Sequence, residues 1–106
     1  MTQAAAGAPL VVAAVLTWND TEMTRACLRS VFASDYPNLR VVLVDNGSRE
    51  PCGRRLKDEF PGLDLVELPE NRGFTGGGNA CLKRGLELGA AYVQLSGNDS
   101  VLAPEA

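Results

Sequence analysis

Four short polar segments, each following an apolar run, contain the side chains that could do chemistry in this 106-residue chain. They are residues 17–19, 45–46, 71–73 and 98–99. They combine carboxylates and amides with one tryptophan and one arginine, groups that hydrogen-bond, stack or pair with charge. In an open parallel sheet the carboxyl ends of the strands share one edge, and ligands bind there. We therefore expect the four segments to lie together and to form one binding site.

Asp45 closes the most continuous of these apolar runs, residues 41–44, and precedes the turn formers Asn46 and Gly47. An apolar run rich in β-branched residues suits a strand that is covered on both faces. The carboxylate could bind a ligand at the end of that strand. It could equally accept hydrogen bonds from the backbone of its own turn. This stretch alone leaves both interpretations open.

The glycine-rich residues 73–78 fit neither of the familiar phosphate-binding loops. Asn79 stands where a P-loop requires lysine. The glycines follow the third predicted strand, whereas the dinucleotide-binding GxGxxG motif follows the first. Glycines permit close approach of the backbone, either to a ligand at a helix N-terminus or to the sheet beneath the helix. Both alternatives stay open.

The pattern of strands and helices predicts an α/β fold, a three-layer, Rossmann-like parallel sheet with right-handed crossovers. The apolar runs that predict its strands are residues 10–16, 39–44, 64–68 and 91–95. Asn19 and Glu22 form a capping box that opens the first helix. Leu82, Leu86 and Leu88 are the apolar residues expected to face the sheet from the last helix.

The composition is that of an ordinary soluble domain, 45% hydrophobic and 22% charged. A net charge of −3 without a basic block argues against a nucleic-acid partner. The three cysteines show no CxxC pairing, which favours free thiols and a cytoplasmic location. Residues 1–9 lack the basic start of a signal peptide and are interpreted as a disordered leader, and residues 10–106 as one domain.

Four motifs resemble, in order and in spacing, those of family 2 glycosyltransferases, which are inverting enzymes of the GT-A fold. The motifs are Leu16-Thr17-Trp18-Asn19, Val44-Asp45-Asn46-Gly47-Ser48, Asn71-Arg72-Gly73-Phe74 with Gly78-Asn79, and Leu95 through Asn98-Asp99-Ser100. Each is short, but together they cover nearly the whole chain after residue 9. The resemblance implies the strand order 3-2-1-4 and transfer of a sugar from a nucleotide-diphosphate donor to an acceptor.

The resemblance also implies roles for individual residues. Thr17 and Trp18 would cradle the base and ribose of the donor, Asp45 would read the edge of the base, and Arg72 would pair with a phosphate. The full set of implied donor-binding residues is Thr17, Trp18, Asn19, Asp45, Asn71, Arg72, Gly73, Asn79 and Asn98.

Asp99 matches the last acid of the family's DxD motif, so the resemblance implies that it holds Mg2+ or Mn2+ against the diphosphate. Gly97 stands where the first acid of that motif is expected, which weakens the inferred metal affinity. One carboxylate with phosphate oxygens and water can still hold Mg2+.

The family's acceptor site and catalytic base follow this turn in the chain. We therefore interpret residues 10–106 as the donor-binding half of a glycosyltransferase, truncated after the fourth strand, which alone transfers no sugar. The acceptor and the catalytic residues stay unnamed. An uncovered edge on the fourth strand would favour self-association into a homo-oligomer.

Two other classes of protein share features with this sequence. A receiver domain with Asp45 as phospho-acceptor requires paired acids after the first strand, and this chain offers only Asp20 there. A non-catalytic nucleotide-binding or interaction module would keep the fold and lack the chemistry.

Overall fold

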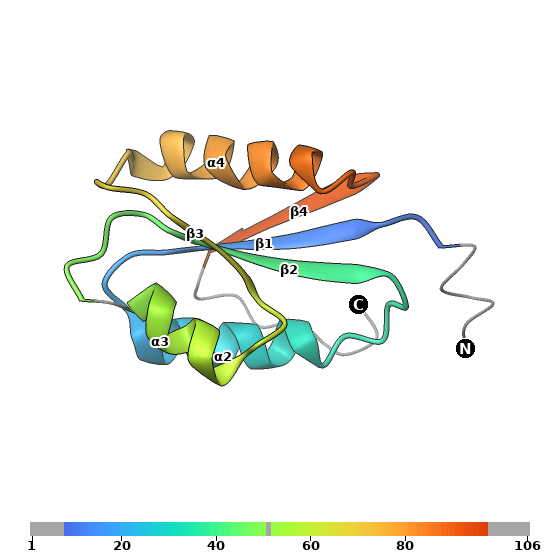
Figure 1. Ribbon diagram of the computed structural model, residues 1–106, viewed down its shortest axis with the longest axis horizontal. Coiled ribbons are helices and arrows are strands. Elements are labelled where there is room, and N and C mark those ends of the chain that lie inside the picture. The colour runs from blue at the N-terminus through green and yellow to red at the C-terminus, as the bar shows by residue number, and fades with distance from the viewer. Residues whose placement is uncertain (1–7, 51, 98–106) are drawn as a thin grey trace.

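The computed structural model describes residues 8–50 and 52–97, in which strands and helices strictly alternate (Figure 1). The elements are β1 (Val11–Thr17), α2 (Thr21–Phe32), β2 (Leu39–Asp45), α3 (Cys52–Glu59), β3 (Asp64–Glu67), α4 (Gly73–Glu87) and β4 (Tyr92–Gly97). The predictions for residues 1–7 and for Asn98 and Asp99 lie outside the described residues.

The strands form one parallel sheet in the order β3-β2-β1-β4, as predicted. Thr17 at the end of β1 is paired with Asp45 at the end of β2, and Leu16 is paired with Gly97 of β4. The carboxyl ends of these strands therefore lie at one edge of the sheet. Within the described sheet β4 pairs only with β1, and self-association through its other edge stays a prediction.

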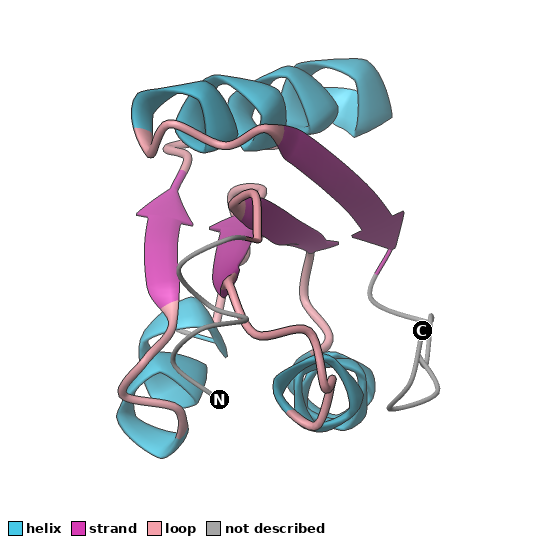
Figure 2. Ribbon diagram, turned by 90° about the vertical axis from the view of Figure 1, so that its right-hand side faces the viewer, coloured by secondary structure: helices cyan, strands magenta, loops and turns pink. Residues whose placement is uncertain are grey.

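Helices cover both faces of the sheet, α4 on one side and α2 with α3 on the other (Figure 2). Successive residues of β1 alternate between the two layers. Ala13 and Val15 pack with α2 and α3, whereas Val12 and Ala14 lie in the cluster that contains Cys81 of α4. Burial on both faces explains why the strand reads as a continuous apolar run.

The predicted capping box of the first helix was wrong by one residue. The N-cap is Asp20, whose Oδ1 accepts a hydrogen bond from the Met23 backbone N–H at 3.1 Å. Asn19 instead adopts a φ of +53°, a left-handed conformation that asparagine tolerates better than most residues. Its Oδ1 accepts a hydrogen bond from the backbone N–H of Arg49, so it is not available to cap α2.

The predicted sheet-facing residues of the last helix were also largely wrong. Leu82 and Leu86 are 44% and 74% exposed, and only Leu88, which follows α4, packs against the core. The buried residues of α4 are Gly77, Gly78, Cys81 and Gly85. The glycines lie so close to the sheet that a leucine side chain has no room there.

The helix-packing interpretation of the glycine-rich stretch is therefore correct for Gly77 and Gly78, and Gly85 later in α4 packs on the sheet in the same way. A Cβ atom on Gly77 would lie 2.6 Å from Leu16 Cδ1, and one on Gly85 would lie 2.4 Å from Val93 Cγ2. Both distances are far below ordinary van der Waals contact.

In the part of the chain that the structure describes, no helix combines the length and the apolar character needed to cross a membrane.

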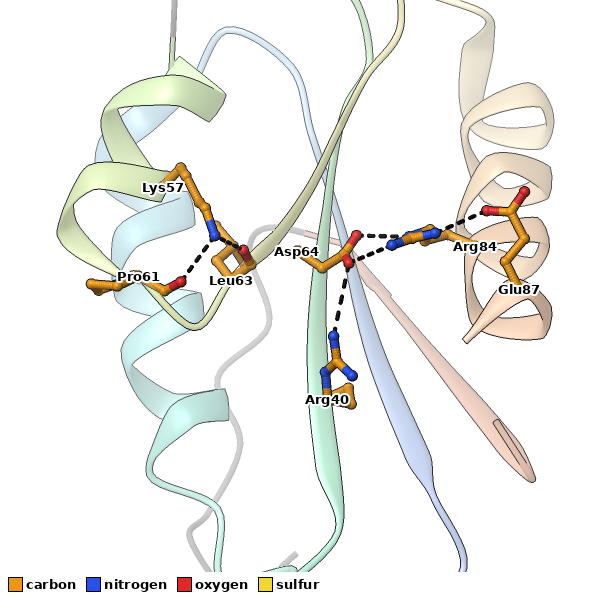
Figure 3. Close-up of polar contacts among 7 residues, drawn as sticks. All are labelled: Arg40, Lys57, Pro61, Leu63, Asp64, Arg84 and Glu87. Atoms are coloured by element: carbon orange, nitrogen blue, oxygen red, sulfur yellow. Dashed lines mark hydrogen bonds and ion pairs between the residues drawn. The ribbon is translucent and has the colours of Figure 1, made fainter. Parts of the chain in front are cut away.

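A group of ion pairs ties the beginning of β3 to its neighbours (Figure 3). The Asp64 carboxylate accepts two hydrogen bonds from Arg84 of α4, from Nε at 2.8 Å and from Nη2 at 2.7 Å. Arg40 of β2 lies 4.0 Å from the same carboxylate, and Arg84 also pairs with Glu87. This group lies at the amino end of β3, opposite the edge that carries the predicted site.

We expect Asp64→Asn to lower the free energy of unfolding by about 1 kcal/mol at pH 7, because the charge-assisted bonds to Arg84 are lost. Arg84 holds the pKa of Asp64 below its ordinary value. A depressed folded-state pKa stabilises the protein above the unfolded value of about 3.9, and this contribution disappears as the pH falls through the folded pKa. Urea denaturation at pH 7 and pH 3 measures the difference.

We expect the difference in free energy of unfolding between wild type and Asp64→Asn to be smaller at pH 3 than at pH 7. Asp58→Asn, at an exposed position of α3, is the matched control and should show little effect at either pH. An Asp64→Asn gap that stays constant with pH would contradict the ion-pair explanation.

Candidate functional site

The loops after the strands meet at the carboxyl edge of the sheet, and Asn46 joins three of them. Its side chain is 4% exposed. Its backbone N–H donates to the Thr17 carbonyl at 2.8 Å. In the side chain, Nδ2 donates to the Gly73 carbonyl at 3.1 Å and Oδ1 accepts from the Arg72 backbone N–H at 2.9 Å. The ends of β1 and β2 and the start of α4 are thus held together by one residue.

Gly47 brings the same loops into direct backbone contact. Its φ is +77°, and a Cβ atom there would lie 2.3 Å from the Glu70 carbonyl carbon and 2.5 Å from the Asn71 nitrogen. The loop after β2 therefore packs against the loop between β3 and α4 with no space for a side chain.

Asn19 and Ser48 connect the loop after β1 to the loop after β2. The Asn19 backbone N–H donates to Ser48 Oγ at 2.8 Å, and Asn19 Oδ1 accepts from the Arg49 N–H at 2.7 Å. The side-chain oxygen of Asn19, one of the residues implied to bind the donor, thus has an internal partner.

The Asp45 carboxylate is buried and hydrogen-bonded on both oxygens. Oδ1 accepts from the Ser48 N–H at 2.9 Å, and Oδ2 accepts from the Gly53 N–H at 3.3 Å and from Cys52 Sγ at 3.6 Å. Asp45 therefore does bond to the backbone of its own turn, through Ser48, and its role as a ligand-binding residue stays a prediction. Two carboxylate oxygens offer about four acceptor positions, so these contacts do not use all of them.

Trp18 lies beside a hollow of about 380 Å³ at this edge. The residues that line it are Leu16, Thr17, Trp18, Asn46, Asn71, Gly73, Phe74 and Gly97. Trp18 is 50% exposed and Phe74 is more exposed still, so two aromatic side chains are accessible beside polar backbone. Aromatic faces of this kind can stack against a nucleobase. The Thr17 hydroxyl is not free for a ligand, because it is hydrogen-bonded to the buried Thr24 hydroxyl at 2.7 Å.

Asn71 and Gly73 line this hollow, whereas Arg72 between them lines a separate one. Asn71 Oδ1 accepts from the Gly73 N–H at 2.7 Å, which shapes the turn into α4. Arg72 is exposed, and no ion pair to its guanidinium is found in residues 8–50 and 52–97. Its charge is therefore accessible to an anion.

Asn79 does not join the residues around Trp18. It lies on the exposed side of α4 and lines a separate hollow of about 290 Å³, together with Arg72 and Lys83. Another hollow, of about 540 Å³, surrounds the ion pairs of Asp64 and lies away from the candidate site.

The sequence placed Asn46 in one of the four polar segments but gave it no role of its own, and Ser48 appeared only within a motif. Asn46 directly follows the buried part of β2, residues 41–45, and a polar side chain in such a place requires internal hydrogen-bond partners. These partners, Arg72 and Gly73, are 26 and 27 residues further along the chain, so no local pattern could reveal them.

The described residues contain no group of three potential metal ligands among His, Cys, Asp and Glu. The predicted metal ligand Asp99 lies outside the described residues, as does Asn98, and the metal site stays a prediction.

Comparison with known proteins agrees with this geometry. The profile of glycosyl transferase family 2 matches residues 13–106. The mannosyltransferase PcManGT from Pyrobaculum calidifontis, solved in complex with GDP-Man and Mn2+, is 28% identical, with a TM-score of 0.73 over 92% of this chain. S. aureus TarS 1-349 in complex with UDP is 22% identical, with a TM-score of 0.75 over 91% of this chain. No curated protein sequence matches significantly.

The chain covers only 29% of each of these two solved chains. Their common architecture and the family match establish the same sheet and helix arrangement here. This chain belongs to glycosyl transferase family 2 and has the GT-A type of fold.

Proposed function

We propose that this chain binds a nucleotide-diphosphate sugar and provides the donor side of a glycosyl transfer. The observation that supports this most directly is the Trp18 hollow, where two accessible aromatic side chains lie beside the loop that carries the exposed Arg72. PcManGT and TarS, solved with GDP-Man and with UDP, have the same fold.

The donor would be held by groups of different chemistry. Trp18 stacks against the base, Arg72 pairs with the diphosphate, and a remaining acceptor position of Asp45 receives a donor group of the base or ribose. Thr17 at the end of β1, Asn19 and Asn71 in the loops and Gly73 at the start of α4 shape the site. Asn79 and Asn98 complete the proposed set.

Asp99 is the proposed ligand of Mg2+ or Mn2+. When bound, the ion neutralises the charge that develops on the departing nucleoside diphosphate. PcManGT, which was solved with Mn2+, supports a divalent ion in this family. Gly97, two residues earlier, lines the Trp18 hollow.

The acceptor side of the reaction is assigned to the part of a full glycosyltransferase domain to which this chain does not align. Inverting transfer requires a carboxylate that removes the proton from the acceptor hydroxyl as it attacks the anomeric carbon. The aligned part is 29% of PcManGT, and we propose that the base and the acceptor site belong to the rest of such a domain.

We expect UDP or GDP with Mn2+ to raise the melting temperature of the chain, since a ligand that binds only the folded state stabilises it. Trp18→Ala should weaken nucleotide binding by about five- to hundredfold, because one stacked base is lost. Isothermal titration calorimetry with UDP, GDP and dTDP measures the affinity, and Trp18→Phe, which keeps an aromatic face, is the matched control.

Asp99→Ala should abolish the Mn2+-dependent part of the stabilisation. Nucleotide binding with an affinity that does not depend on Mn2+ would favour a non-catalytic binding module. If none of the nucleoside diphosphates binds at millimolar concentration, the proposed function is wrong.

A further inference from the structure

Asn46 contacts the backbone of two consecutive residues in the loop that opens α4. Its Oδ1 accepts from the Arg72 N–H at 2.9 Å, and its Nδ2 donates to the Gly73 carbonyl at 3.1 Å. The Arg72 N–H can only donate and the Gly73 carbonyl can only accept, so the two ends of the amide are each matched to one partner. We propose that Asn46 is a positioning residue that holds the Arg72–Gly73 turn in its ligand-binding position before the donor arrives.

Among residues 8–50 and 52–97, Asn46 is the distant side chain that hydrogen-bonds to the backbone of this turn. The N-cap of α4 is Arg72, whose own side chain makes no capping hydrogen bond. The bond from the Gly73 N–H to Asn71 Oδ1 is local and moves with the turn. Gly47 packs against the preceding backbone at Glu70 and Asn71, one step before the turn itself.

Asn46 is itself firmly held. It is buried to 4% exposure, and its backbone N–H donates to the Thr17 carbonyl at 2.8 Å. The position of the turn is therefore transmitted from the end of β1, next to Trp18, through Asn46 to Arg72. The aromatic face and the cation that are proposed to hold the base and the diphosphate thus come from one connected unit.

A turn that is ordered in advance improves affinity. Binding then does not have to offset the loss of backbone and side-chain freedom that ordering the loop would require. Without the Asn46 amide, the Arg72 N–H and the Gly73 carbonyl would exchange their buried partner for water and the turn would open. This inference rests on the proposed function only for the identity of the ligand.

The test compares Asn46→Ala and Asn46→Asp with the wild type. Asparagine-to-aspartate keeps the acceptor for the Arg72 N–H but loses the donor to the Gly73 carbonyl, so it should be intermediate. The first readout is the rate of trypsin cleavage after Arg72, well below the melting temperature and followed by mass spectrometry. Cleavage after Lys83, on the exposed side of α4, is the internal reference for opening of the helix itself.

The second readout is UDP and GDP affinity. Trp18 is the single tryptophan of the chain and lines the same hollow, so its fluorescence reports binding. Gly85→Ala, which disturbs α4 at its contact with Val93 and away from Trp18, is the control for a general loss of stability.

We expect Asn46→Ala to be cleaved after Arg72 at least tenfold faster than the wild type and to bind the nucleotide at least tenfold more weakly. Gly85→Ala should leave both values close to the wild type. Cleavage of Asn46→Ala at the wild-type rate, or a change shared with Gly85→Ala, overturns the positioning role. If Asn46→Ala is cleaved faster but binds the nucleotide as tightly as the wild type, the proposal that Asn46 assists donor binding is wrong.

The two proposals fail in distinguishable ways. If the wild type binds no nucleotide, the proposed function fails together with the ligand named here, and the cleavage rates still decide whether Asn46 holds the turn. If Asn46→Ala does not fold, as judged by circular dichroism, the same comparison is made with Asn46→Asp.

Discussion

Replacing Gly47 with alanine is expected to lower the free energy of unfolding by about 2–5 kcal/mol, the sum of left-handed strain and overpacking. Gly47 has a φ of +77°, and the added Cβ would lie 2.3 Å from the Glu70 carbonyl carbon. The obstructing atoms are backbone and cannot rotate away as a flexible side chain could. The loop between β3 and α4 must therefore move, and with it Arg72. Urea denaturation followed by circular dichroism measures the loss.

Gly89 offers a control that separates the two causes. It has a φ of +79°, but a Cβ added there meets nothing within 4 Å. Gly89→Ala should therefore show only the strain, about 1–2 kcal/mol. Equal losses in the two variants would mean that the contact between the loops contributes nothing. We also expect weaker nucleotide binding in Gly47→Ala and unchanged binding in Gly89→Ala.

Gly85→Ala is expected to destabilise the chain by about 1–3 kcal/mol through overpacking. In an exposed helix the same substitution would stabilise by about 1 kcal/mol, because alanine is the better helix former. At Gly85 the new methyl group would lie 2.4 Å from Val93 Cγ2 of β4, so the packing cost exceeds the gain in propensity.

If this explanation holds, the effect of Gly85→Ala on stability should change sign when Val93 is also replaced. Val93→Ala removes the obstructing methyl groups, and in that background Gly85→Ala should be neutral or stabilising. A double-mutant cycle from four urea denaturation curves gives the coupling energy directly. Gly78→Ala, whose Cβ would lie 3.3 Å from Leu95 Cδ2, should cost less than Gly85→Ala. Additive effects of Gly85→Ala and Val93→Ala would contradict this account.

The architecture could be predicted because its signals are local. The apolar run that ends at Asp45 marks a strand buried on both faces, and the alternation with helical patterns leaves few topologies for a parallel sheet. The strand order 3-2-1-4 came from the resemblance to the family and is confirmed. The first helix began one residue later than expected, because Asp20 and not Asn19 accepts the capping bond.

The buried face of α4 could not be predicted in the same way. Periodicity identifies large apolar residues and treats them as the core, so Leu82 and Leu86 were assigned to it. The distance between helix and sheet is a property of the packed molecule, and here it is short enough that only glycines and Cys81 fit.

The sequence by itself determined which strand ends carry polar and aromatic side chains, and so it located the candidate site at the edge that holds Trp18 and Asp45. Only the tertiary structure decided how these groups are used. It bonds the Asp45 carboxylate to Ser48 and Gly53, separates Asn79 from Trp18 and makes Asn46 the link between loops. The physical reason is that hydrogen-bond partners are set by distance in space. The residues that meet at Asn46 are brought together only when the strands pair and α4 packs on the sheet.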